Sequence, residues 1–207
     1  MQASKVDRFY ERRADTLAPL YDSVAFADVH AGLLPFLPAP GARVLDVGSG
    51  SGRDAIALAR MGYQVTAAEP SSSLRQYAIA QDRTGCVCWL DDRLPALASL
   101  AGQPNKFAVI LCSGVLMHLS APELISSIAT LGALLRAEGR LALSLRPLHR
   151  SESRTLFHDH RPLSVISAGL RAGLSLVKSY ESDDALGRTD RIWSTFVFAK
   201  EIYPIMD

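Results

Sequence analysis

Residues 44–59 read VLDVGSGSGRDAIALA, and this stretch decides the fold. Its apolar start predicts a strand over Arg43–Val47, and its end predicts a helix over Gly52–Arg60. Between them lies the loop Gly48-Ser49-Gly50-Ser51-Gly52. Glycines remove the Cβ atoms, so a ligand can approach the backbone, and the start of a helix offers unpaired N–H groups. The stretch therefore predicts a strand, loop and helix whose loop forms the floor of a cofactor site.

Short apolar runs and helical patterns alternate after this unit. The expected strands are 64–68, 86–90, 107–112 and 140–145, and the expected helices are 72–81, 122–136 and 163–172. The strands are rich in Val, Ile and Leu and almost uncharged, which is typical of a sheet buried on both faces. The pattern predicts an α/β fold with a largely parallel sheet.

The end of the chain differs from this alternation. Residues 174–180 (LSLVKSY) and 192–199 (IWSTFVFA) both have strand character. The intervening ESDDALGRTDR is too short and turn-rich for a crossover helix. These two strands must therefore pair antiparallel or lie apart.

A helical region, Ala3 to about Leu37, precedes the first strand. Segments before the first strand can cover the mouth of an open α/β sheet, so residues 1–40 are expected to form a lid that supplies part of an acceptor pocket. Tyr21, with an apolar body and a polar tip, suits this role, although plain packing of an amphipathic helix is the alternative. No linker divides the sequence, so 1–207 is expected to be a single domain with a core over 41–200.

Composition excludes several classes of protein. The chain has 207 residues, 22 Lys and Arg against 21 Asp and Glu, and a net charge of +1. This balance disfavours a non-specific nucleic-acid binder or a polybasic membrane anchor, and no apolar run is long enough to span a bilayer. The charged start lacks the apolar centre of a signal peptide, so a soluble, cytoplasmic protein is expected. Cys86, Cys88 and Cys112 match neither a disulfide framework nor a zinc site and are expected to be buried apolar side chains.

Glu69 ends the second strand, about 20 residues after Gly48, where a carboxylate can accept both hydroxyl groups of a ribose. These features also fit a dinucleotide site, since Gly50-Ser51-Gly52 begins a degenerate GxGxx(G/A) pattern. Asp46 favours a different ligand. A carboxylate there would repel a pyrophosphate, whereas beside a cationic sulfonium ligand it can order the loop and favour the charge.

Several motifs occur together in the right order: VLDVGSGSGR, AAEP, WLDDRLP, FAVILCSGVLMHL and EGRLALSLR. Over about 41–200 the chain resembles class I S-adenosylmethionine-dependent methyltransferases. The resemblance implies a Rossmann-like three-layer sandwich with a seven-stranded, mostly parallel sheet whose last strand is antiparallel. Within that superfamily the chain resembles the small-molecule branch that includes the tellurite-resistance and thiopurine-type enzymes.

The resemblance also implies which residues contact S-adenosylmethionine. The residues expected to line its amino-acid part are Gly48, Ser49, Gly50 and Gly52, with Asp46 ordering the loop. Glu69 would hold the ribose, and Pro70 would shape the adenine pocket. Asp91 or Asp92 would receive the adenine amine beside Arg93, and Ser113 would lie under the methionine part. The sequence Cys112-Ser113-Gly114-Val115 differs from the (D/N)PP(Y/F/W) pattern of enzymes that methylate base amines, so a small-molecule acceptor is expected rather than a nucleic acid.

Two residues follow strands on the expected acceptor side. His118 is the nearest candidate general base, although it also fits a surface or loop-ordering role. Arg146 ends the fifth strand and suits an anionic acceptor such as a carboxylate, although a solvated loop is equally compatible. His158 and His160 lack a third ligand, so no metal is expected. An NAD(P)-dependent oxidoreductase and a non-catalytic, methyltransferase-like binding module are the competing hypotheses, and the oligomeric state is left open.

Overall fold

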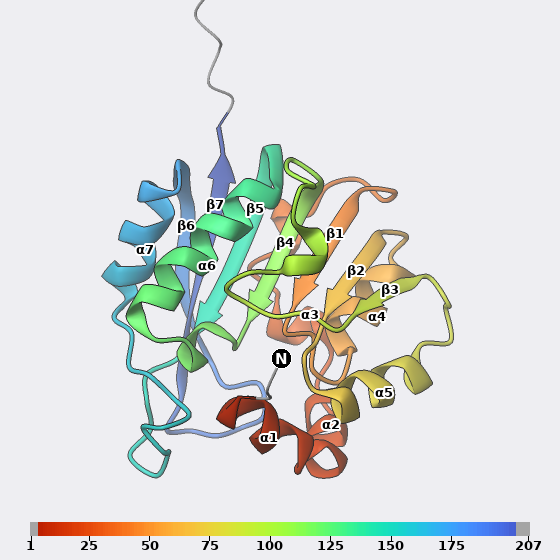
Figure 1. Cartoon of the computed structure of the whole chain (residues 1–207), viewed down its shortest axis with the longest axis vertical. Coiled ribbons are helices and arrows are strands. Elements are labelled where there is room, and N and C mark those ends of the chain that lie inside the picture. Colours follow the sequence, from red (N-terminus) through yellow and green to blue (C-terminus); the bar gives the residue numbers. More distant parts are fainter. Residues whose placement is uncertain (1–3, 202–207) are drawn as a thin grey trace, which may run out of the picture.

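The computed structural model describes residues 4–201, and its seven strands form one sheet (Figure 1). The strand order is β3-β2-β1-β4-β5-β7-β6. The strands are β1 (Arg43–Val47), β2 (Gln64–Ala68), β3 (Val87–Leu90), β4 (Phe107–Ser113), β5 (Leu135–Leu145), β6 (Leu174–Asp183) and β7 (Ile192–Lys200). The helices are α1 (Lys5–Glu11), α2 (Ala14–Asp22), α3 (Phe26–Val29), η1 (Leu34–Phe36), α4 (Arg53–Arg60), α5 (Ser72–Gln81), η2 (Ala98–Leu100), η3 (Leu116–His118), α6 (Ala121–Leu134) and α7 (Pro162–Arg171).

The first five strands are parallel, and β7 is antiparallel to both of its neighbours. The expected antiparallel pairing of the last two strands is therefore confirmed, as is the α/β fold. In the doubly wound dinucleotide-binding fold the sixth strand lies directly beside the fifth. Here the antiparallel β7 separates β5 from β6. The sheet thus departs from the oxidoreductase arrangement at this edge.

Apolar side chains cover both faces of the sheet because successive residues of a strand point to opposite sides. On one face, Leu45 and Ile110 pack with Leu124 and Ile128 of α6. On the other face, Val44 and its neighbours pack with residues of α3 and α4. Figure 1 shows α6 and α7 in front of the sheet and α4 behind it. This three-layer packing fixes the strand ends that form the site.

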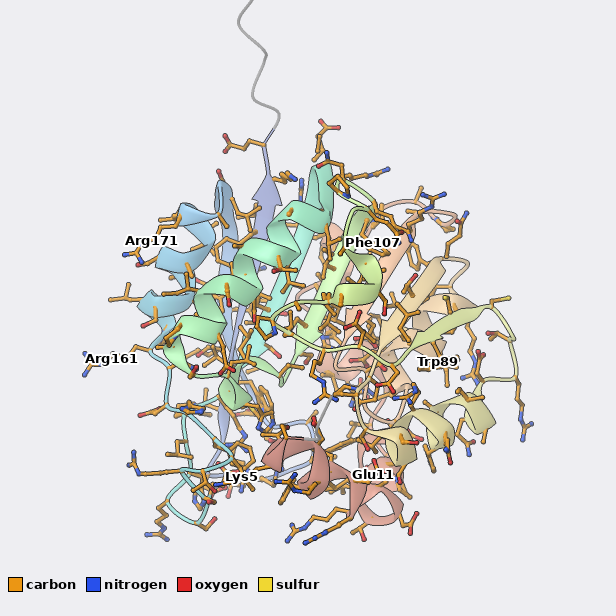
Figure 2. All side chains as sticks on the ribbon, viewed as in Figure 1. Lys5, Glu11, Trp89, Phe107, Arg161 and Arg171 are labelled. Carbon is orange, nitrogen blue, oxygen red and sulfur yellow. The ribbon has the colours of Figure 1, made fainter. Side chains whose placement is uncertain are left out.

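The first two helices, α1 and α2, lie at the carboxyl end of the parallel strands. Figure 1 shows α1 and α2 below these strand ends, and Figure 2 labels Glu11 there, opposite Phe107 at the start of β4. The expected helical region is broken into α1, α2, α3 and η1, with turns between them. Ala3, its expected first residue, lies outside the described residues.

The boundary between α6 and β5 differs from the expectation. The helix ends at Leu134, and β5 begins directly at Leu135, five residues before the expected strand start at Arg140. Leu135 is fully buried and pairs with Phe107, while Glu138 adopts a left-handed backbone conformation. The pairing of β4 with β5 shifts register between Phe107 and Val109. A local irregularity therefore extends a strand that the sequence pattern shows only from Arg140 onward.

The expectation for the cysteines is right for Cys112 and wrong for the other two. Cys112 is buried in β4, whereas Cys86 and Cys88 are exposed. The reason is that β3 is a four-residue strand at the edge of the sheet. Among the described residues, no helix is long and apolar enough to cross a bilayer.

Candidate active site

A cavity of about 1120 Å³ lies at the carboxyl ends of β1, β2, β4 and β5. Ligand pockets commonly measure about 300–1,000 Å³, so this one has room for a cofactor and a second small molecule. The candidate site residues that line it are Tyr21, Asp46, Gly48, Ser49, Gly50, Glu69, Pro70, Asp92, Arg93, Ser113, His118 and Arg146. Gly52 and Asp91 do not line it.

Each glycine of the loop after β1 has a positive φ angle, which disfavours other residues. A Cβ atom added to Gly48 would collide with Val115, and one added to Gly52 would collide with side chains of α5 and β3. A Cβ atom on Gly50 would meet only Tyr21, at 3.8 Å. Gly52 therefore serves packing at the start of α4, and Gly50 is the glycine at which the backbone is open toward the cavity.

Asp46 is a buried carboxylate beside this loop. Its Oδ2 atom has no hydrogen-bond partner, and neither does the buried Oγ atom of Ser49. Burial raises the pKa of Asp46 well above its usual range, and repulsion from Asp54 adds to the effect. A buried acceptor without a donor is costly. A ligand ammonium group would donate to this atom, and the positive charge of a sulfonium would be attracted to the ionised carboxylate.

Glu69 directly follows β2 and is 5% exposed. Its Oε2 atom accepts the N–H of Gly50 at 2.8 Å, and its Oε1 atom accepts the N–H of Ser71 at 2.8 Å. Burial raises the pKa of Glu69 to about 7, and these two hydrogen bonds oppose the shift. A carboxylate offers about four acceptor positions, so two remain for ligand hydroxyl groups.

The two aspartates after β3 lie in different surroundings. Asp92 is buried, and its carboxylate accepts the N–H groups of Arg93, Ala98 and Ser99 at 2.7–3.1 Å. The Asp91 side chain is 65% exposed and forms an ion pair with Arg75. Arg93 forms an ion pair with Asp7 of α1. Of the two aspartates that the sequence left open, Asp92 lines the cavity and Asp91 does not.

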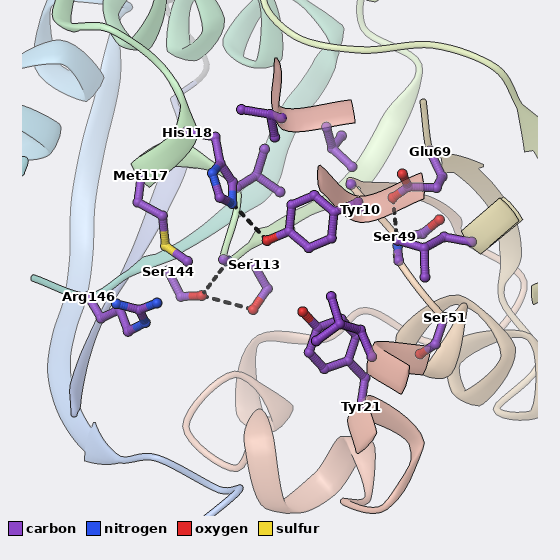
Figure 3. Close-up of a pocket in the computed structure, with 18 of the residues that line it drawn as sticks. Tyr10, Tyr21, Ser49, Ser51, Glu69, Ser113, Met117, His118, Ser144 and Arg146 are labelled. Carbon is purple, nitrogen blue, oxygen red and sulfur yellow. Dashed lines mark hydrogen bonds between the residues drawn. The ribbon is translucent and has the colours of Figure 1, made fainter. Parts of the chain in front are cut away.

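His118 ends η3 and lines the cavity on the side opposite Glu69 (Figure 3). Its Nδ1 atom lies 2.8 Å from the carbonyl oxygen of Leu156, so Nδ1 carries the proton of the neutral ring and donates it. Its Nε2 atom then accepts the hydroxyl hydrogen of Tyr10 at 2.9 Å. Burial lowers the pKa of His118, and Arg146 lowers it further, against the effect of the Leu156 hydrogen bond. His118 is therefore neutral near pH 7, with the basic nitrogen directed at a polar partner in the site.

Arg146 directly follows β5 and is 5% exposed. Its Nη1 atom donates to Glu152 at 2.7 Å, and its Nη2 atom donates to the second oxygen of the same carboxylate. Arg146 is thus a buried residue of the site rather than part of a solvated loop. Its pairing with Glu152 fixes the guanidinium group at the cavity wall.

Tyr10 is a site residue for which the sequence offered no role. It comes from α1, 108 positions before its partner His118, and Figure 3 shows its ring among the side chains of the pocket. The neighbouring Glu11 accepts the hydroxyl groups of Ser71 and Ser73 at 2.8 Å. No local pattern predicts such long-range contacts. Within residues 4–201 there is no group of three or more His, Cys, Asp or Glu side chains that could hold a metal ion.

Comparison with known proteins shows the family of this chain and other proteins with its fold. The chain is 38% identical over 106 residues to the ubiquinone biosynthesis O-methyltransferase of Xanthomonas campestris, a match that covers 51% of this chain and 43% of that protein. The magnesium protoporphyrin IX methyltransferase of Synechocystis PCC 6803, solved with bound SAM, shares the fold with a TM-score of 0.66, 19% identity and coverage of 97% and 86% of the two chains. The [4+2]-cyclase SpnF shares it with a TM-score of 0.74 and 14% identity over 98% of each chain. Residues 20–180 match the family model described as a methyltransferase domain, and the chain belongs to this family.

Proposed function

We propose that this protein transfers the methyl group of S-adenosylmethionine to a hydroxyl group of a small molecule, with His118 as the proton acceptor. One observation carries the proposal: a single cavity joins the glycine loop and Glu69 to the basic nitrogen of His118. Membership of the methyltransferase family supports the cofactor, and the similarity to O-methyltransferases over about half of the chain supports oxygen as the methylated atom.

The cofactor end of the cavity fits S-adenosylmethionine. The unpartnered Oδ2 of Asp46 suits the positive charges of the methionine part, and Glu69 has acceptor positions for the ribose hydroxyls. Gly50 lets the ligand approach the backbone. Asp92, with three N–H groups already bound, keeps one acceptor position for the adenine amine. The proposal therefore assigns adenine binding to Asp92 rather than to Asp91.

Bound S-adenosylmethionine supplies an electrophilic methyl group and leaves as S-adenosylhomocysteine, with the electron pair of the broken carbon–sulfur bond on sulfur. The contribution of the chain is to align the acceptor oxygen with that methyl group and to exclude water. As the new oxygen–carbon bond forms, the hydroxyl proton moves to Nε2 of His118, whose Nδ1–H stays bonded to Leu156. The hydroxyl of Tyr10 marks the hydrogen-bond position that the acceptor hydroxyl takes when it binds.

Three narrower expectations are part of the same proposal. The first is that the protein belongs to the branch of tellurite-resistance and thiopurine-type methyltransferases. The second is that its acceptor is not a nucleic acid, and the third is that it acts in the cytoplasm. Helices α1 and α2 lie across the strand ends and line the cavity, which supports an acceptor small enough to be enclosed.

The test combines binding with turnover. Calorimetry should show that S-adenosylhomocysteine binds and NAD(H) does not, and methyl-labelled S-adenosylmethionine should pass its label to a component of a small-molecule extract. His118→Gln should lower the methylation rate by about 10²–10⁴-fold and leave S-adenosylhomocysteine affinity unchanged. His160→Gln is the matched control, because His160 also bonds a backbone carbonyl, that of Leu119, but does not line the cavity.

Binding of NAD(H) without S-adenosylhomocysteine would favour the oxidoreductase. Tight S-adenosylhomocysteine binding with no label transfer to any extract, together with a stable protein partner, would favour the binding module. Equal rates for His118→Gln and the unmodified protein would remove His118 from the mechanism.

A further inference from the structure

At the acceptor end of the cavity, two guanidinium groups share one carboxylate. Glu152 accepts Arg146 Nη1 at 2.7 Å through Oε2 and Arg191 Nη1 at 3.0 Å through Oε1. The side chains are 5% exposed for Arg146, 11% for Glu152 and 16% for Arg191. All three residues line the cavity. This cluster joins the end of β5 to the loop between β6 and β7.

The cluster carries one surplus positive charge. Burial would raise the pKa of Glu152, but the hydrogen bonds and charges of its arginine partners lower it to about 2, so the carboxylate is ionised. The neighbouring acidic groups do not cancel the surplus. Asp184 accepts hydrogen bonds from Arg188 and from the indole N–H of Trp193.

The remaining acidic groups near the cluster are in contact with solvent. Asp190, whose side chain is 57% exposed, is paired with His149 at 2.7 Å and lies 3.8 Å from the Nε of Arg191. Asp183 lines the cavity but is exposed. A charge in contact with water is screened, whereas a buried charge is screened much less. The positive surplus therefore acts mainly on a ligand inside the cavity.

Two donor nitrogens of this cluster form no hydrogen bond. The buried Nε atoms of Arg146 and Arg191 have no hydrogen-bond partner, although Glu152 accepts both Nη atoms of Arg146 and the Nη1 atom of Arg191. The carboxylate of Asp190 approaches the Nε atom of Arg191 only to 3.8 Å. Burying a charged donor without an acceptor is costly. A ligand with anionic oxygen atoms would satisfy both donors, and a carboxylate has two such oxygens.

Aromatic side chains flank the same guanidinium group. The Cζ of Arg146 lies 5.6 Å from the ring centre of Phe157 and 5.8 Å from that of Trp193. The ring of Phe157 also contacts His118, with centroids 4.7 Å apart. Asp184 holds the indole N–H of Trp193 at 2.9 Å and so fixes its orientation. One wall of the cavity thus runs from the general base to the arginine pair and suits a flat ring.

From this arrangement we infer that the acceptor is an aromatic hydroxycarboxylate, held by Arg146 and Arg191 through its carboxylate while its hydroxyl group meets His118. The inference rests on the proposed function, because it assigns the substrate class of that same site. It also gives Arg191 a role in specificity that no feature of the sequence indicated.

In the experiment, the protein is first saturated with S-adenosylhomocysteine. Benzoate, the three hydroxybenzoates and the matching neutral amides are then titrated into this complex, each in a separate run. At least one hydroxybenzoate should bind about tenfold or more tightly than its amide, a preference of about 1.4 kcal/mol. Arg191→Gln should abolish that preference, because it leaves Arg146 and Glu152 as a neutral pair. Arg161→Gln removes the same charge at an exposed site before α7, outside the cavity (Figure 2), and should leave the preference intact.

The first titration, with S-adenosylhomocysteine alone, separates the two proposals. Failure of that ligand to bind would overturn the proposed function and the inference that depends on it. If it binds but no hydroxybenzoate binds better than its amide, the acceptor class is wrong and the proposed function stands. A preference that survives in Arg191→Gln would equally overturn the role of the arginine pair.

Discussion

Replacing Glu69 by glutamine separates what the cofactor site contributes to binding from what it costs the folded protein. The carboxylate is 5% exposed, and burial raises its pKa from 4.5 to about 7. Because the pKa is higher in the folded than in the unfolded protein, the ionised form destabilises the fold. At 1.36 kcal/mol per pKa unit this penalty amounts to about 3 kcal/mol, and it develops as the pH rises from 4.5 through 7.

The amide of Glu69→Gln does not titrate, so it escapes this penalty. It retains one acceptor for Gly50 or Ser71 and loses the other, a cost that is the same at every pH. Relative to the unmodified protein, the free energy of unfolding of the variant should therefore increase by about 3 kcal/mol between pH 4.5 and pH 8. Denaturant unfolding of the ligand-free protein at both pH values measures this difference.

Cofactor binding should change in the opposite sense. Two ribose hydroxyls donate to an ionised carboxylate, and a hydrogen bond to a charged group contributes about 1.5–3 kcal/mol. Losing one such contribution weakens S-adenosylhomocysteine binding by about 10- to 150-fold at pH 8. In the unmodified protein the form with ionised Glu69 binds S-adenosylhomocysteine best. The affinity should therefore increase by up to about tenfold for each pH unit as the pH is raised toward 7, and it should level off above pH 7.

Calorimetry at pH 6, 7 and 8 tests the binding half, with Glu181→Gln, an exposed carboxylate on β6, as the control. Affinity that does not vary between pH 6 and 8, or a Glu69→Gln variant that binds as tightly as the unmodified protein, would show that the ribose is not held by Glu69. A stability difference that stays constant with pH would refute burial as the cause of the raised pKa.

Three further changes test other parts of the structure. Gly50→Val places a side chain toward Tyr21 at a φ of +56°, so we expect S-adenosylhomocysteine binding to be lost in calorimetry while strain of about 1–2 kcal/mol leaves the fold intact by circular dichroism. Glu11→Gln weakens the contact of α1 with Ser71, and stopped-flow measurement should show faster S-adenosylhomocysteine dissociation; an unchanged rate would mean that α1 does not act as a lid. Ile110→Ala creates a cavity beside α6 and should lower the free energy of unfolding by about 2–5 kcal/mol in denaturant titrations, with unchanged stability contradicting the assigned core.

The sequence was informative about the part of the cavity lined by Asp46, the glycine loop and Glu69, because that part is built from contiguous segments. A parallel strand delivers its last residues to one edge of the sheet, so Asp46, Glu69 and Asp92 had to lie near one another once the strands were identified. The glycine pattern marks the place where backbone, rather than side chains, faces the cavity at Gly50. Gly52 shows the limit of this reasoning, because a glycine can be required for packing behind the loop as well as for contact in front of it.

The contacts of α1 could not be predicted in the same way. The hydrogen bond between Tyr10 and His118 depends on how a helix outside the sheet lies across the strand ends, and no periodicity encodes that position. The same holds for the pair of exposed cysteines, since the sequence of β3 does not say that it is an edge strand. Both outcomes depend on tertiary neighbours rather than on local preference.

The acceptor end is harder to predict for a physical reason that also bears on function. It is assembled from side chains of separate loops, with His118 after β4, Arg146 and Glu152 after β5, and Arg191 before β7. Each of these loops can change without disturbing the sheet, and the structural similarity to a [4+2]-cyclase shows that this fold also occurs in a protein with a different named activity. The fold and the glycine loop therefore constrain the kind of ligand that the strand ends can hold more than they constrain the acceptor. Substitutions in the loops should change which acceptor binds while leaving S-adenosylhomocysteine affinity unchanged, which is why the arginine pair, and not the glycine loop, is the place to look for the substrate.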